Sequence, residues 1–259
     1  MKKKIISLFM SALMITALVG CGAQKDESTL NQIKEKEKIT YALTGAYPPF
    51  NYIDEKGKLV GFDVDIANAL AEKMGVEAEP VTTQWDGIIG GLKSKRFDTI
   101  IGSMAITDER LKEVSFTDPY YYDGAQFFAK KDLNFKSIND LKDGKVGVVT
   151  GTTFQKELEG MSNIKEILQF EGDIENFMAA ADGRSDGLVT SRFVGLQAPK
   201  EYNLVPVGQL LYTEKIGVAV RKDDNELLEA LNSALKEIIE DGTYAEISNK
   251  WFSRNILEK

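Results

Sequence analysis

The sequence predicts an α/β protein built around mainly parallel sheets. Short segments rich in β-branched residues alternate along the chain with longer amphipathic segments, and this alternation places a helix between successive strands. Several of the short segments are almost continuously apolar, which is typical of strands buried on both faces of a parallel sheet. The predicted strands, in chain order, are Ile39–Leu43, Thr99–Ile101, Val146–Val149, Gly187–Thr190 and Ile216–Val220.

Two amphipathic segments are predicted as helices. Asp63–Met74 carries apolar residues at helical spacing and stops before Gly75, a residue type that commonly ends helices. Asp223–Asp241 repeats this pattern, begins with a capping-box-like pair of Asp223 and Glu226, and ends before a glycine. Prolines and glycines are scattered rather than gathered into a linker, so the sequence does not indicate a head-to-tail split into two domains.

Composition and charge exclude several classes of function. The chain has 259 residues, 43% of them hydrophobic, so it is long enough to bury a substantial core. Its formal charge of −8 argues against a nucleic-acid partner, which requires clustered cations. The absence of histidine removes Ser-His-Asp and Cys-His catalysis and histidine-ligated zinc. We expect neither a metal nor a cofactor.

Residues 1–20 have the composition of an export signal. Lysines follow Met1, and the apolar segment Ile5–Val19 is shorter than the about 20 residues that span a bilayer. Residues 18–21 resemble a bacterial lipobox, so we expect a lipidated Cys21 that anchors the protein to the outer face of the cytoplasmic membrane. The alternative is ordinary signal cleavage beside an incidental thiol. Residues 21–36 are polar and are predicted to form a tether.

Short motifs occur in a characteristic order from residue 47 onward. They are Tyr47–Phe50, Gly61–Asp65, Trp85–Ile88, Phe97–Met104, Ala105–Arg110, Phe116–Tyr120, Lys145–Val149 with Gly151–Thr153, and Asp241–Tyr244. This series resembles the extracellular solute-binding proteins of polar amino acid ABC transporters, a type II periplasmic-binding-protein family. The resemblance implies a two-lobed Venus flytrap with two crossover hinge segments. It also implies lobe 1 from residues 37–125 plus 217–259, lobe 2 from residues 126–216, and hinges within Gln126–Lys130 and Glu214–Val220.

The function implied by this resemblance is capture of an amino acid or related small solute and its delivery to a membrane permease, without catalysis and by a monomer. One alternative is a dehydratase on the same scaffold, of the cyclohexadienyl or arogenate type. That reaction needs a general acid in the cleft, and no Asp or Glu falls on a motif with that role. Another alternative is a stand-alone ligand sensor, which would need a signalling domain that the chain, stopping at Lys259, does not contain.

The resemblance assigns the ligand's carboxylate to Arg110, whose planar guanidinium suits a carboxylate. Taken alone, an arginine in this setting is usually a solvated surface charge. Gly102, Ser103 and Ala105 match a loop whose backbone groups reach the ligand, and relatives commonly carry Ser or Thr where Ala105 stands.

The resemblance places further contacts on both lobes. Thr152 and Thr153 open a predicted helix whose free N–H groups would add to the grip on the carboxylate, although a simple N-cap explains them equally well. Tyr47 and Trp85 match aromatic positions that sandwich the ligand's side chain, although an aromatic residue is by default part of the core.

Three positions depart from the pattern of relatives. Ser191 stands where many relatives carry an aspartate that binds the ligand's α-ammonium, and serine cannot neutralise a cation. The ligand then lacks a free α-amine, another acid substitutes, or amino acids bind poorly. Thr44 and Phe154 replace an acid and an amide of relatives selective for basic amino acids, so we predict that lysine and arginine are not preferred. An apolar, aromatic-walled pocket suited to a thioether, disulfide or aliphatic side chain is expected instead.

Overall fold

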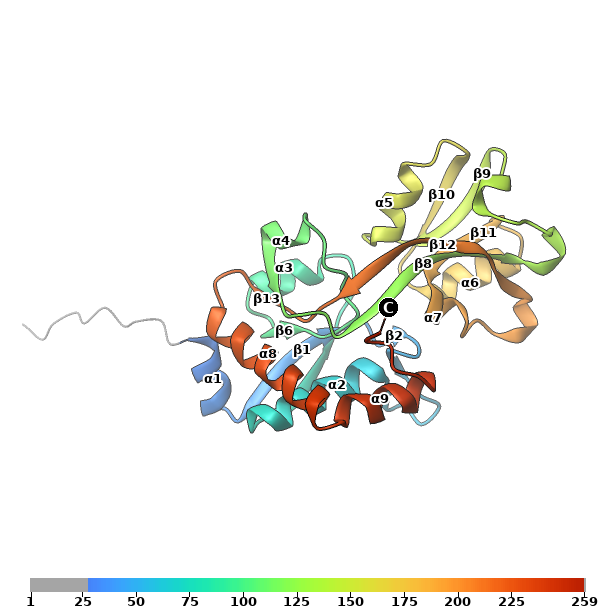
Figure 1. Ribbon diagram of the computed structural model, residues 1–259. Helices are drawn as coiled ribbons and strands as arrows, with labels where there is room; N and C mark the ends of the chain where they lie inside the picture. The colour runs from blue at the N-terminus through green and yellow to red at the C-terminus, as the bar shows by residue number, and fades with distance from the viewer. Residues whose placement is uncertain (1–27, 259) are drawn as a thin grey trace, which may run out of the picture.

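Two five-stranded sheets organise the protein into two lobes (Figure 1). The structure is a computed structural model and describes residues 28–258; the predicted signal peptide, Cys21 and residues 22–27 of the predicted tether lie outside them. No described helix combines the length and apolar character needed to cross a membrane. The predicted α/β class and two-lobed architecture are confirmed.

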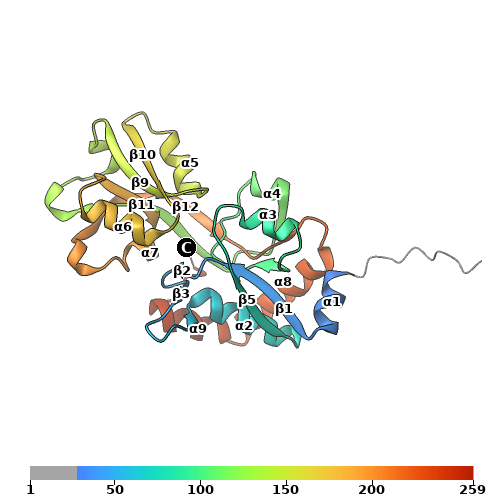
Figure 2. The ribbon, with the colours of Figure 1, turned by 180° about the vertical axis from the view of Figure 1, so that it is seen from behind.

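Lobe 1 is assembled from two separated stretches of chain. Its sheet has the order β5-β1-β6-β13-β7, and helices α2, α8 and α9 pack against one another beside it (Figure 2). The elements are α1 (Thr29–Glu35), β1 (Lys38–Leu43), β2 (Ala46–Tyr47), β3 (Asn51–Ile53), β4 (Leu59–Val60), α2 (Phe62–Met74), β5 (Glu77–Thr82), α3 (Ile88–Lys93), β6 (Thr99–Ile100), α4 (Arg110–Glu113), β7 (Val114–Phe116), β13 (Ala219–Arg221), α8 (Asn225–Glu240) and α9 (Thr243–Phe252).

Lobe 2 is continuous in sequence, and its sheet has the order β10-β9-β11-β8-β12. The elements are β8 (Tyr121–Lys130), η1 (Lys131–Leu133), η2 (Ile138–Asp140), β9 (Gly144–Val149), α5 (Thr153–Glu159), β10 (Ile164–Phe170), α6 (Asp173–Ala181), β11 (Gly187–Ser191), α7 (Arg192–Gly195), η3 (Lys200–Tyr202) and β12 (Leu204–Ile216).

The prediction of mainly parallel sheets is wrong. Strands β1, β5 and β6 are parallel in lobe 1, and β9, β10 and β11 are parallel in lobe 2. In each sheet, however, the strand reached through a crossover runs the other way: β13 is antiparallel to β6 and β7, and β8 is antiparallel to β11 and β12. The sheets are mixed because the chain leaves lobe 1 through β8 and returns through β12.

Four of the five predicted strands form as expected, but Ile216–Val220 does not form one strand. Ile216 ends β12, and β13 begins at Ala219 in the other sheet, because this segment passes between the lobes. Both predicted helices form, and Gly75 ends α2 in the left-handed region at φ 73°. The predicted capping box of α8 is absent. Its N-cap is Asp224, whose carboxylate forms an ion pair with Arg221 at 2.8 Å instead.

The two crossover strands form an antiparallel ribbon that joins the lobes. The ribbon begins at the pair Tyr121–Ile216 and continues into the sheet of lobe 2. Residues 126–130, expected as a hinge, pair with β11 inside that sheet, so the first crossover lies before them. The backbone N–H of Tyr122 also donates to Ile256 O at 3.0 Å, which attaches the C-terminal segment to the ribbon.

The predicted tether is also too long. Helix α1 packs on α8, and its Ile33 is only 1% exposed within the core of lobe 1. The hydroxyl of Thr29 donates to Asp224 at 2.7 Å, which fixes the start of the helix. Residues 29–35 therefore belong to the folded lobe.

Candidate functional site

A cavity of about 480 Å³ lies between the two lobes. Its walls come from loops that follow β1, β5 and β6 in lobe 1 and β9 and β10 in lobe 2, together with the crossover strands β8 and β12. Loops at the carboxyl ends of parallel strands are where open α/β sheets commonly bind ligands. The volume suits a small solute.

Arg110 is the first residue of α4 and lines this cavity. Its guanidinium donates to Ala105 O at 3.0 Å and, across the cleft, to Gly151 O at 3.5 Å, and it lies 5.4 Å from the Trp85 ring centroid. Burial lowers the pKa of the half-buried guanidinium, and the negative charge of Glu214 opposes this effect. No carboxylate among residues 28–258 forms an ion pair with Arg110. A positioned cation is therefore available to an anionic ligand group.

The predicted loop of Gly102, Ser103 and Ala105 lines the cavity. The hydrogen-bond donors of Ser103 bind other protein groups, whereas the backbone N–H of Ala105 binds none among residues 28–258. Ser103 adopts φ 61°, its hydroxyl donates to Asp63 at 2.8 Å, and its N–H donates to the Tyr120 hydroxyl at 3.1 Å. These two donors are thus used within the protein, to Asp63 and to the Tyr120 hydroxyl that itself donates to Asp63 at 2.7 Å, although Ser103 lines the cavity. Ala105 presents a backbone N–H that forms no hydrogen bond in the described part of the chain. Gly102 lines the cavity against Leu43.

Aromatic side chains line the cavity as predicted. Trp85 reaches from lobe 1 to lobe 2, where its indole N–H donates to Gly151 O at 3.2 Å. Tyr47 lines the cavity and stacks on Phe50 at 5.6 Å between ring centroids. Phe154 contributes from α5 of lobe 2. These three residues give the cavity apolar walls.

The three threonines singled out from the sequence line the cavity, together with Thr82 and Thr83. Thr152 is the N-cap of α5, so the simpler interpretation of this residue is correct, and the residue faces the cavity as well. Its hydroxyl donates to Val149 O at 2.7 Å and accepts from the Gln155 N–H at 3.3 Å. The hydroxyl of Thr153 donates to Glu214. Thr44 donates to Asn51 at 3.1 Å beside β1.

Ser191 is not among the residues that line the cavity, although it lies beside Tyr47 and Asp123, which are; that it faces the ligand stays a prediction. It is the N-cap of α7, where its oxygen accepts from Phe193 N at 3.2 Å and Val194 N at 3.3 Å. Its hydroxyl donates to the carboxylate of Asp123, and Asp123 does line the cavity. The neighbouring strand β8 thus brings a carboxylate to the cavity directly beside Ser191.

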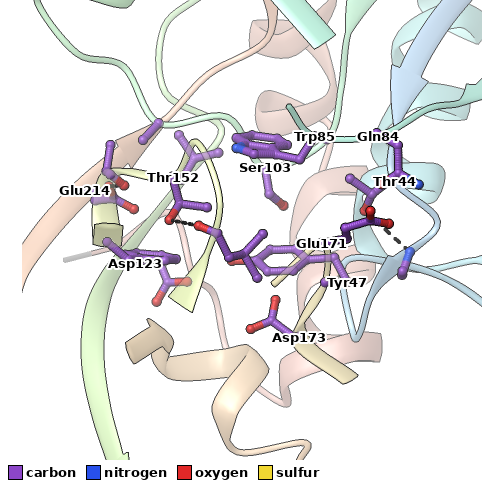
Figure 3. A pocket seen from close by; sticks show the side chains of 18 of the residues that line it. Thr44, Tyr47, Gln84, Trp85, Ser103, Asp123, Thr152, Glu171, Asp173 and Glu214 are labelled. Carbon is purple, nitrogen blue, oxygen red and sulfur yellow. Dashed lines mark hydrogen bonds between the residues drawn. The ribbon is translucent and has the colours of Figure 1, made fainter. Parts of the chain in front are cut away.

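Carboxylates, which were not expected from the sequence, line the cavity alongside its apolar and aromatic residues. Figure 3 shows Glu214 and Asp123 on one side, Glu171 on the opposite side, and Asp173 beside Tyr47 between them. Burial raises the pKa of Asp123 to about 7 and that of Asp173 to about 6. Burial also raises the pKa of Glu214, which the hydroxyl of Thr153 opposes.

Sequence reasoning missed these acids, although a usable signal was present. Asp123 follows two tyrosines at the start of β8, and Glu171 and Asp173 flank a glycine directly after β10. Polar residues directly after a parallel strand lie at its carboxyl end, which is where such sites form. Within residues 28–258, no group of three or more Asp, Glu, His or Cys side chains could hold a metal ion.

The position of Ser191 leads to a test by substitution. Ser191→Asp would place a second carboxylate against buried Asp123 and replace the hydroxyl bonded to it. We expect no gain in affinity for amino acids and a loss of about 1–3 kcal/mol of unfolding free energy. Calorimetry and urea unfolding measure the two quantities. A clear gain in affinity would mean that position 191 does face the ligand.

The fold and site together define a class of protein. Two α/β lobes joined by paired crossover strands, with a solute-sized cavity between them, are the design of a two-lobed solute receptor. The chain belongs to the bacterial extracellular solute-binding proteins, family 3, which it matches over residues 39–254.

Named relatives span nearly the whole chain. The L-cystine-binding protein TcyJ of Escherichia coli (strain K12) is 35% identical over 255 residues, 96% of either chain. ABC transporter arginine-binding protein 1 of the same organism is 37% identical and covers 83% of this chain and 91% of its own length. A solved structure of the ancestral amino acid-binding protein AncCDT-1, a precursor of cyclohexadienyl dehydratase, has a TM-score of 0.82 and 38% identity, covering 87% of this chain and 100% of that chain.

Proposed function

We propose that this protein captures an α-amino acid outside the cytoplasmic membrane and delivers it to an ABC transporter permease. The observation that carries the proposal is the charge arrangement of the cavity. Lobe 1 contributes Arg110, which has no ion-pair partner in the described part of the chain, and lobe 2 with the crossover strands contributes the acids. The names of the relatives, which bind cystine or arginine, support an amino acid as the solute.

The ligand's carboxylate is assigned to Arg110. Transferring a carboxylate from water into a cleft is costly unless it meets a fixed cation. The guanidinium is already oriented by Ala105 O and Gly151 O, so little side-chain entropy remains to be lost on binding. Each charge-assisted hydrogen bond is worth about 1.5–3 kcal/mol. The unpaired N–H of Ala105 supplies a further donor.

The ligand's α-ammonium is assigned to Asp123. This carboxylate is 3% exposed and is held by the hydroxyl of Ser191, by Gly124 N at 2.7 Å and by Arg192 Nε at 3.4 Å. Among the hypotheses that Ser191 left open, substitution by another acid has this support. A free α-amine in the ligand is compatible with the site.

Capture is coupled to closure because the opposite charges lie on different parts of the molecule. A zwitterion that touches Arg110 of lobe 1 and the acids of lobe 2 and the ribbon favours the state in which the lobes are near each other. Direct contacts add to this state. Trp85 donates to Gly151 O across the cleft, and Glu109 forms an ion pair with Lys156. The closed form would then dock on the permease.

Anchoring by a lipidated Cys21 and a monomeric state complete the proposal. Two acyl chains on one cysteine provide the double attachment that stable anchoring requires. With α1 packed on lobe 1, the tether shortens to residues 21–28.

The test is a calorimetric screen of the mature domain without lipid against the common amino acids and cystine. We expect saturable binding of at least one of them, and a rise in Tm that grows with its concentration; at 100 times Kd the added stability is about 2.7 kcal/mol. Small-angle scattering should show a smaller radius of gyration with that ligand. Failure of every amino acid to bind would contradict the proposed function.

A dehydratase is the second candidate, and one observation favours it. Asp123 and Asp173 are buried carboxyl groups with raised pKa values in the cleft, which is what a general acid requires. Neither acid belongs to a motif that could be connected with that role from the sequence. We still favour binding alone, because the relatives named above are binding proteins. Incubation with prephenate and with arogenate should yield no aromatic product; product that disappears in Asp173→Asn would establish the enzyme instead.

A further inference from the structure

We infer that Asp173 forms a subsite for a second cationic group of the ligand, so that the preferred solute is an amino acid with an ammonium or guanidinium group at the end of its side chain. This inference rests on the proposed function and adds a substrate class to it. It replaces the expectation, drawn from Thr44 and Phe154, that lysine and arginine are not preferred.

The first observation is a buried carboxylate that lines the cavity beside the Thr190 hydroxyl and has no cationic partner in the described part of the chain. Asp173 is 3% exposed and lines the cavity, and its Oδ1 has no hydrogen-bond partner in the described part of the chain. Asp173 is the first residue of α6, and the partial positive charge of the helix N-terminus offsets a small part of the free-energy cost of burying its carboxylate. It makes no capping hydrogen bond there. A buried acid left in this state lacks the cation that would compensate its desolvation.

The second observation is the balance of charge around the cavity. The described lining holds Asp123, Glu171, Asp173 and Glu214 against the single cation Arg110. Asp123 is already close to Arg192, and Glu214 accepts from Thr153 and is the acid whose charge acts most on Arg110. The α-ammonium of the ligand goes to Asp123. Asp173 and Glu171 then have no cationic partner among the described lining residues. A ligand whose only positive charge is its α-ammonium does not supply one.

The third observation is where these acids lie. In Figure 3, Glu171 is on the side of the cavity opposite Glu214, and Asp173 lies between the two. Because Glu214 marks the end of the cavity near Arg110, Glu171 marks the end that the ligand's side chain would reach. A second carboxylate, as in cystine, would find no second cation among the described lining residues.

The test compares cationic amino acids with neutral analogues of the same shape. We expect L-arginine to bind at least about tenfold more tightly than L-citrulline at pH 7.5, and L-lysine to exceed L-norleucine similarly, because charge-assisted pairing of a buried acid is worth at least one factor of ten. In Asp173→Asn this preference should fall about tenfold or more while citrulline binding changes less than about threefold. Glu171→Gln should produce a smaller fall, because Glu171 is exposed.

Glu175→Gln is the matched control. Glu175 is an exposed acid in the first turn of the same helix and does not line the cavity, so it should leave the preference unchanged. Equal weakening of cationic and neutral ligands by Asp173→Asn would overturn the inference, as would an equal effect of Glu175→Gln. Equal binding of arginine and citrulline by the unaltered protein would overturn it too and leave the proposed function intact. If no amino acid binds at all, the proposed function fails first. Thermal unfolding of each variant confirms that it is folded.

Discussion

Replacing Arg110 with alanine should weaken binding of the amino acid ligand at least about 100-fold. The substitution removes the cation that lines the described cavity, and two charge-assisted hydrogen bonds of about 1.5–3 kcal/mol each correspond to factors between 10² and 10⁴ in Kd. The side chain also reaches Gly151 O across the cleft, so the closed state loses a contact between the lobes. Isothermal titration calorimetry measures the affinity, and scattering with and without ligand measures closure.

Two further variants make this result specific. Arg110→Lys keeps a positive charge but loses the planar fork, so we expect intermediate affinity. Arg96→Ala removes an exposed arginine from the same lobe and should change neither Kd nor closure. Unchanged affinity in Arg110→Ala would show that the ligand's anionic group binds elsewhere. Equal losses of affinity in Arg96→Ala and Arg110→Ala would show that only the overall electrostatic potential of lobe 1 affects binding.

Many helices and strands could be predicted because the local pattern of apolar residues and glycines indicates them. The apolar segment at Val146–Val149 is buried in the middle of a sheet, and α2 ends where Gly75 adopts positive φ. The mixed strand directions could not be predicted in this way. Periodicity reports burial, whereas the direction of β8 and β13 depends on which lobe the chain is entering. For the same reason Ile216–Val220 is predicted as one strand, although its residues belong to strands of two different sheets.

The candidate site divides in a similar manner. Positions carried by ordered motifs, such as Arg110 and Trp85, lie at the cavity as the resemblance implied. The acids do not belong to those motifs. Asp123 and Ser191 are distant in sequence and meet only because β8 pairs with β11, so the exchange of acid and hydroxyl between them is invisible without the register. The sequence could therefore indicate that another acid substitutes for one at position 191, but it could not identify Asp123 as that acid.

The unpaired state of Asp173 has a consequence for the protein without ligand. Burial raises its pKa from 3.8 to about 6, so the folded protein binds this proton more tightly than the unfolded chain does. For an acid with a raised pKa, the unfolding free energy is highest below pH 4 and falls as the pH rises through the window from about 4 to 6. A shift of this size corresponds to about 3 kcal/mol, and Asp123 and Asp63, whose pKa values burial raises to about 7 and about 6, contribute with the same sign.

Asp173→Asn should therefore stabilise the ligand-free protein at pH 7.5 by about 1–3 kcal/mol, because a neutral amide replaces a buried charge that no cation compensates. It should also flatten the decline between pH 4 and 6, while Glu175→Gln, which removes a charge that adds to the raised pKa of Asp173, should change both by less. Urea unfolding at pH 4.5 and 7.5 measures the two effects. A cationic ligand should reproduce the gain in the unaltered protein, since pairing lowers the pKa of Asp173 and binding then releases a proton. Stability that is lost in Asp173→Asn at pH 7.5 would show that the carboxylate already has a partner within the protein. Asp173 would then have a structural role. A variant that is more stable without ligand but no longer prefers cationic ligands would instead show that the Asp173 carboxylate serves ligand binding and lowers the stability of the ligand-free protein.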